Sequence, residues 1–148
     1  MRADGGATSA DRFVDETLRL RQSEYLYRTT SQAIDFEGFA IPAGWLVRLC
    51  IRESHTAADA FERPHEFDPD RFLAAPYPPE RYQPFGIYEH ACIGAAVTKT
   101  VGRVFVEGLA GGFDAAVVRD GPMELGLHHH GHWTPSRRLG IRLTPRAS

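Results

Sequence analysis

A ten-residue segment in the second half of the chain holds the side chains best suited to chemistry. Within residues 85–94, the thiol of Cys92 follows His90 by two positions, and the residues after Cys92 have helical spacing. A thiol at the start of a helix meets unpaired backbone N–H groups and the positive end of the helix dipole, and both favour the thiolate. The segment therefore predicts a thiolate at the mouth of a helix.

The residues around this cysteine indicate what the thiolate would bind. Gly86 and Gly94 allow the backbone to approach a flat, bulky object, and His90 is a basic group that can meet an anion on that object. Haem has a flat face, two propionates and an iron that accepts a thiolate ligand. The alternative is a structural cysteine buried before an ordinary helix, since free cysteine is among the most buried residue types.

Three motifs resemble those of the cytochrome P-450 family of haem-thiolate monooxygenases. Residues 85–94 are similar to its cysteine-ligand loop, F-G-x-G-x-(H/R)-x-C-x-G. Residues 16–19 match its E-x-x-R helix motif, and residues 67–72 match its F-x-P-x-R-F motif. The resemblance extends from about Asp11 to Arg146. It implies a flexible N-terminus over residues 1–10, followed by the haem-ligating C-terminal part of a P-450 domain over residues 11–148.

The resemblance also implies roles for individual residues. Cys92 would be the axial ligand of the iron of haem b, and Arg28 and His90 would bind its propionates. The remaining residues implied to shape or support the haem site are Phe85, Gly86 and Gly94 in the loop, and a buried triad of Glu16, Arg19 and Arg71.

The chain departs from the family pattern at several positions. Tyr88 stands where the family usually has a second glycine, and a positive φ there would cost on the order of 1 kcal/mol. Gln22-Ser23 replaces prolines after the E-x-x-R helix, and His55-Thr56-Ala57 replaces a charged triplet.

The family's chains are much longer, and their central helix, with its acid–alcohol pair, has no counterpart here. We therefore expect a truncated or split form of an oxygen-activating monooxygenase, acting on a small organic substrate and lacking the distal half. Such a form would need a missing N-terminal part or an N-terminal partner chain. The alternative is a non-catalytic haem-binding remnant or structural fragment.

Two further clusters suggest ligands or partners. Lys99 and Arg103 lie one turn apart and would form a docking patch for an electron donor such as ferredoxin, or simply a solvated helix face. The histidines of residues 128–132 would place His128, His130 and His132 on one face of a strand, which suggests a zinc-binding module as a less favoured alternative.

The elements that must position these residues indicate an α+β chain. Helical spacing predicts a helix over residues 12–23 with Asp11 as N-cap, and another from near Cys92 to Gly111-Gly112. Strand signals cover residues 25–30 and 33–36, and a hairpin is predicted between 39–41 and 45–51. A long loop over 55–84 would hold a short helix near 57–61. The tail predicts a final hairpin between MELGL and LGIRL.

Composition is that of an ordinary globular domain. The 148 residues are 43% hydrophobic and 24% charged, with a net charge of −2, so nothing favours nucleic acid or an anionic membrane surface. Two cysteines do not make a disulfide framework, and no segment resembles a signal peptide or a membrane span. We therefore expect a cytoplasmic protein.

Overall fold

The first helix begins earlier than the sequence predicts. The computed structural model describes residues 8–22, 24–74, 76–119, 123–126, 132–135 and 138–146. In it, helix α1 runs over Ser9–Arg21, so it begins inside the segment expected to be flexible. Asp11 is not the N-cap. Thr8 is the cap, and the Thr8 and Asp11 side chains bond to each other's backbone N–H, as in a capping box.

A nested pair of β-ribbons follows α1. Strand β1 (Tyr25–Thr29) pairs with β4 (Leu46–Cys50), and β2 (Ile34–Phe36) pairs with β3 (Phe39–Ile41) between them. The predicted hairpin between 39–41 and 45–51 is therefore wrong. Glu37 and Gly38 both have positive φ, 51° and 83°, and form the tight turn that closes β2 onto β3. Gly44, with φ 80°, turns the chain back toward β1, where its N–H donates to the carbonyl of Thr30.

A short helix that the sequence does not predict leads into the long loop. Helix α2 spans Ile51–His55, whereas residues 57–61 form only a turn, closed by the N–H groups of Ala60 and Phe61 on the carbonyl of Ala57. A short 3-10 helix, η1 (Pro69–Phe72), follows. The small core lies between these segments and α1, and its apolar members are Ala10, Val14, Leu20, Ile51, Phe61 and Phe72.

The second long helix, α3 (Ala95–Gly112), crosses α1. It begins three residues after Cys92 and follows a 3-10 turn, η2 (Tyr88–His90). Gly102 allows the two helices to approach, since a Cβ there would lie 3.1 Å from a methyl carbon of Val14. At its C-terminal end, α3 continues directly into an extended Phe113 rather than ending on a left-handed glycine.

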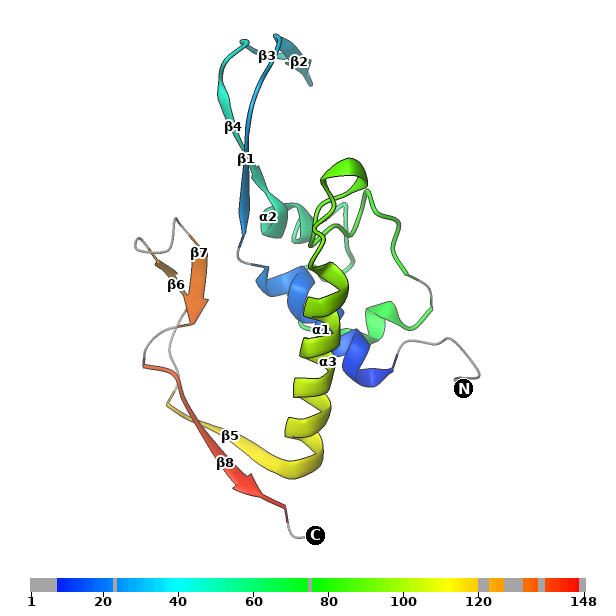
Figure 1. The fold of residues 1–148 in the computed structure, drawn as a ribbon, viewed down its shortest axis with the longest axis vertical. Coiled ribbons are helices and arrows are strands. Elements are labelled where there is room, and N and C mark those ends of the chain that lie inside the picture. The colour runs from blue at the N-terminus through cyan, green and yellow to red at the C-terminus, as the bar shows by residue number, and fades with distance from the viewer. Residues whose placement is uncertain are drawn as a thin grey trace.

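Two more ribbons follow α3. Strand β5 (Phe113–Arg119), not predicted from the sequence, pairs with β8 (Gly140–Pro145), and β6 (Met123–Gly126) pairs with β7 (His132–Pro135). MELGL and LGIRL therefore do not form one hairpin with each other. Figure 1 shows α1 and α3 at the centre, with the β1–β4 ribbon extending to one end and the β5–β8 ribbon to the other. The mixture of helices and small antiparallel ribbons agrees with the predicted α+β class.

Candidate functional site

Five of the six residues expected to contact haem meet around one cavity, and Gly94 is the one that does not line it. It has a volume of about 520 Å³ and lies between the end of α1, strand β1 and the loop before α3. Leu18, Leu26 and Ile51 belong to its apolar wall. The cavity is lined by five of the residues that the sequence predicts for the site: Arg28, Phe85, Gly86, His90 and Cys92.

The loop that carries Cys92 is fixed by its own backbone. The Cys92 N–H donates to the carbonyl of Phe85 over 2.8 Å, which brings the two ends of the loop together. Gly86 has φ 74°, and a Cβ there would lie 3.0 Å from the carbonyl oxygen of His90. Glycine is therefore needed at this position, both for the backbone conformation and for space.

Cys92 is exposed and lies just outside α3. Gly94 is the N-cap, and a Cβ on it would lie 3.7 Å from the Cys92 sulfur. In this described part of the chain, no side chain caps the first turn of the helix, and that turn carries no acidic residue. The sulfur therefore lies close to an uncapped helix N-terminus, a place that favours an anion.

The backbone of Tyr88 has φ 52°, in the left-handed region that costs free energy for a residue other than glycine. Its hydroxyl donates to the Glu80 carboxylate over 2.5 Å. This hydrogen bond lowers the pKa of Glu80 and raises the pKa of Tyr88. The loop thus contains a strained tyrosine whose side chain is tied to the segment before it.

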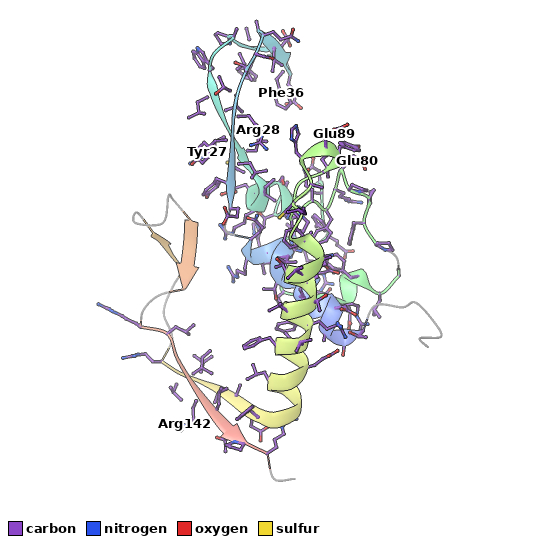
Figure 2. All side chains as sticks on the ribbon, in the orientation of Figure 1. Tyr27, Arg28, Phe36, Glu80, Glu89 and Arg142 are labelled. Carbon is purple, nitrogen blue, oxygen red and sulfur yellow. The ribbon has the colours of Figure 1, made fainter. Side chains whose placement is uncertain are left out.

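Arg28 and His90 lie where two cavities meet. A second cavity of about 650 Å³ shares both residues with the first and extends along the β1–β4 ribbon. Figure 2 shows Arg28 on this ribbon, facing the loop that carries Glu89, with Glu80 nearby. One N–H of the Arg28 guanidinium donates to the carbonyl of Tyr27 at 2.8 Å. The two basic side chains therefore reach the rim of the cavity from different elements.

Glu16, Arg19 and Arg71 form a network that does not line the cavity. Arg19 donates from Nε and Nη2 to the Glu16 carboxylate at 2.7 and 2.8 Å, and Nε of Arg71 lies 3.0 Å from the same carboxylate. The Glu16 and Arg19 side chains are fully buried. Both arginines also donate to backbone carbonyls of the segment before η1, namely Glu62, Arg63, Pro64 and Glu66.

His55 is a site-supporting residue that sequence reasoning missed. Its side chain is fully buried, and its Nε2 accepts a hydrogen bond from the N–H of Gln83 at 3.0 Å. Burial, followed by repulsion from the Arg19 charge, lowers the pKa of His55 to about 4. In the sequence His55 appeared only as a departure from the family's charged triplet, and nothing there indicated its contact with Gln83, two residues before the cysteine loop.

The docking patch predicted for Lys99 and Arg103 is not an open positive surface. The Lys99 ammonium lies 2.7 Å from the carboxylate of Asp15, and Arg103 lies 3.5 Å from Asp11 and 3.6 Å from Glu107. Both bases face carboxylates of α1 because the two helices cross here. Their charges are therefore largely neutralised within the protein.

The histidine cluster contributes no metal site within the described residues. His128, His129 and His130 lie outside those residues, and His132 begins β7. Over the described ranges, no three potential metal-binding side chains come together. Nor does any helix there have the length and apolar character needed to cross a bilayer.

Comparisons with known proteins agree with this geometry. A family model described as Cytochrome P450 matches residues 9–135. Abscisic acid 8'-hydroxylase 2 of Arabidopsis thaliana is 33% identical over 135 residues, covering 90% of this chain and 27% of that protein. Abscisic acid 8'-hydroxylase 2 of Oryza sativa subsp. indica is 37% identical over 95 residues, covering 64% of this chain and 19% of that protein. The chain thus spans about a quarter or less of the length of these relatives.

Solved structures give the same family. The retinoic acid-bound cyanobacterial CYP120A1 superposes with a TM-score of 0.81 at 29% identity, covering 93% of this chain and 32% of that one. The heme domain of a cytochrome P450DA mutant gives a TM-score of 0.77 at 24% identity, covering 93% of this chain and 31% of that one, and supports the fold alone.

Proposed function

The chain belongs to the cytochrome P450 family, and we propose that it provides the cysteine-ligating part of an oxygen-activating haem monooxygenase. Members of this family bind haem and receive electrons from redox partners. In the proposal, the Cys92 thiolate is the axial ligand of the iron in haem b, and Arg28 and His90 bind the propionates. The observation that carries it is that all three side chains line the same cavity of about 520 Å³.

The donor set of this cavity fits a haem. It offers one thiol, three basic groups (Arg21, Arg28 and His90) beside the one carboxylate of Glu24, and an apolar wall that includes Leu18 and Leu26. Gly86 leaves its side of the loop free of a side chain, which suits close approach by a flat ring. When bound, haem supplies oxygen activation, and a thiolate ligand favours O–O cleavage by pushing electron density toward the iron.

The protein's own residues hold the thiolate in place. The Phe85 carbonyl fixes the backbone of Cys92, and the N-terminus of α3, without a side-chain cap, begins three residues after it. The cationic Arg28 attracts carboxylates at the rim. The buried network of Glu16, Arg19 and Arg71 orders the long segment that leads to the cysteine loop. These groups orient and bind.

The substrate we propose is a small organic acid. The relatives are named as hydroxylases of abscisic acid, and the solved cyanobacterial relative binds retinoic acid. The hydroxylase names support hydroxylation, and both names support an organic acid as substrate, for the whole protein to which this chain corresponds. For the electron donor we propose a small redox protein such as a ferredoxin. Lys99 and Arg103 remain the proposed docking residues, although each lies beside a carboxylate of α1.

The apolar face of α3 supports the proposal that further polypeptide of the P450 fold completes this site. Val97, Val101, Val104 and Phe105 form one face of α3 and are 58–66% exposed. Contiguous exposed apolar residues mark association surfaces in soluble proteins. We propose that this face is covered in the active enzyme, either by a longer form of the chain or by a partner chain.

The alternative function is haem binding without catalysis, which is favoured by the exposure of Cys92. An open site does not exclude water, and water promotes side reactions at a reactive centre. The haem-loaded chain, supplied with a ferredoxin, its reductase and a candidate acid, distinguishes the two. Transfer of isotopically labelled oxygen from O2 into the acid supports the monooxygenase. Thiolate-type haem binding without labelled product, both in the chain alone and in the chain joined to the remaining polypeptide of a P450 fold, supports the non-catalytic alternative.

A further inference from the structure

We propose that His55 is a positioning residue that connects the buried Glu16–Arg19–Arg71 network to the backbone of the loop carrying Cys92. The inference rests on the proposed function of Cys92 as the haem ligand. The position of His55 in the sequence does not by itself suggest a role in the site.

On one side, His55 is fixed by the network. It is the last residue of α2, and its side chain is fully buried. Arg19 Nη1 donates to the carbonyl oxygen of His55 at 2.8 Å, while the same guanidinium binds Glu16. The imidazole lies against two aromatic rings, with ring centroids 6.1 Å from Phe61 and 5.4 Å from Tyr82. Neither the backbone nor the ring of His55 is therefore free to move independently of α1.

On the other side, His55 holds the start of the cysteine loop. Its Nε2 accepts from the Gln83 N–H at 3.0 Å. The Gln83 carbonyl in turn accepts from the Gly86 N–H at 3.1 Å, and the Phe85 carbonyl accepts from the Cys92 N–H at 2.8 Å. A continuous path of hydrogen bonds and short chain segments thus leads from Arg19 to the amide of the ligand residue, and its first two bonds are buried or part-buried.

The chemistry of the ring suits this task. Because Nε2 accepts, the proton of the neutral imidazole is on Nδ1, and in the described part of the chain Nδ1 has no hydrogen-bond partner. A residue that only filled space in the core would not need the unpaired Nδ1–H group. An apolar ring would fill the same volume without it. The acceptor at Nε2 is therefore the feature that distinguishes histidine here.

The test compares side chains that differ in where they place an acceptor. In His55→Gln, the carboxamide oxygen reaches the region of Nε2, whereas in His55→Asn it reaches only that of Nδ1, and His55→Leu has no acceptor. Phe72→Leu is the matched control, because Phe72 is buried in the same core and contacts Tyr82 but makes no hydrogen bond along the path. Amide hydrogen exchange of the full chain without haem measures protection of residues 83–92 against that of α1.

We expect His55→Asn and His55→Leu to accelerate exchange over residues 83–92 on the order of tenfold relative to α1. His55→Gln should keep most of the protection. Phe72→Leu should lower the exchange protection of residues 83–92 and of α1 by similar factors. Equal behaviour of the Gln and Asn variants, or parallel loss of protection in α1 and the loop for all His55 variants, overturns the inference.

A second readout separates this inference from the proposed function. After addition of haem, the reduced, CO-bound spectrum of the parent tests thiolate ligation alone. A parent without a thiolate spectrum refutes the proposed ligand, and the exchange pattern still decides whether His55 positions the loop. If the parent has that spectrum, His55→Leu should lose a larger fraction of it than Phe72→Leu does. Equal spectra in the two variants at matched haem content overturn the link from His55 to the ligand.

Discussion

Arg19 and Glu16 make a two-point contact in which Nε and Nη2 of the arginine donate to the two carboxylate oxygens at 2.7 and 2.8 Å. Neither side chain is exposed to solvent. The same carboxylate accepts from Arg71 and from the N–H of Asp68, so it is the point at which α1, η1 and the preceding loop meet. The single buried carboxylate of Glu16 is thus paired with two arginines.

Removing that carboxylate should be highly destabilising. Glu16→Ala leaves Arg19 and Arg71 buried without their counter-charge, and we expect a loss of roughly 3–5 kcal/mol in the free energy of unfolding. Urea denaturation measures it. Glu62→Ala is the control, because the Glu62 side chain is 89% exposed, and should change stability by less than about 0.5 kcal/mol. A Glu16→Ala midpoint close to that of the parent would mean that the network is solvated.

Stability should depend on pH through His55. Its folded pKa is lowered from 6.5 to about 4, so the fold favours the neutral ring. The contribution is complete above about pH 6.5 and is lost as the pH falls toward 4, by up to about 3 kcal/mol in total. The charged and titratable groups around the ring are Arg19, which repels the imidazolium, and Tyr82, which stays protonated in this range.

Unfolding by urea at several pH values in this window measures the effect. The difference in stability between parent and His55→Gln should shrink toward acid, because glutamine does not titrate. A constant difference across the window would show that the ring does not change charge on unfolding.

Tyr88 provides a test of backbone strain. Its φ of 52° suits glycine, so Tyr88→Gly should be more stable than Tyr88→Phe by about 1 kcal/mol. Tyr88→Phe removes only the exposed hydroxyl bond to Glu80 and should lie close to the parent. Thermal denaturation of the three proteins ranks them. A Gly variant no more stable than the Phe variant would mean that the loop relaxes away from this conformation.

The apolar face of α3 should make the isolated chain associate. We expect binding of a hydrophobic dye and light scattering above that of a monomer, because Val101 and Phe105 are 62% and 65% exposed. Val101→Glu should reduce both signals. Ala110→Glu, an exposed position on the opposite side of the same helix, is the control. A parent that is monomeric, binds little dye and takes up haem tightly would contradict the proposal that further polypeptide covers this face.

The sequence was most informative where several residues had to satisfy one geometry at once. Residues 85–94 contain both the glycine that the loop needs and the cysteine that the loop presents, so the loop's share of the cavity lining could be expected from the sequence, whereas the apolar wall of Leu18, Leu26 and Ile51 could not. The relation of Glu16 and Arg19 also followed from their spacing on a helix, since residues three apart share a face.

The pairing of strands was less predictable. Pro42-Ala43-Gly44 has the residues of a tight turn, but the turn that closes β2 onto β3 uses Glu37 at positive φ, a residue type with no strong preference for it. Strand β5 follows α3 without any turn residue between them. The role of His55 depends on a contact with Gln83, 28 positions away, which spacing along the chain does not reveal.

The central claim is that Cys92 ligates haem iron as a thiolate, and the reduced, CO-bound spectrum of the haem-loaded chain tests it most directly. The parent and Cys50→Ala should both give the Soret band that is diagnostic of a thiolate ligand, because Cys50 lies in β4 and does not line the cavity that holds Cys92. Cys92→Ser, nearly isosteric but a poor ligand, should lose this band while keeping its helical circular dichroism. An unchanged thiolate band in Cys92→Ser, or its loss in Cys50→Ala instead, would contradict the assignment.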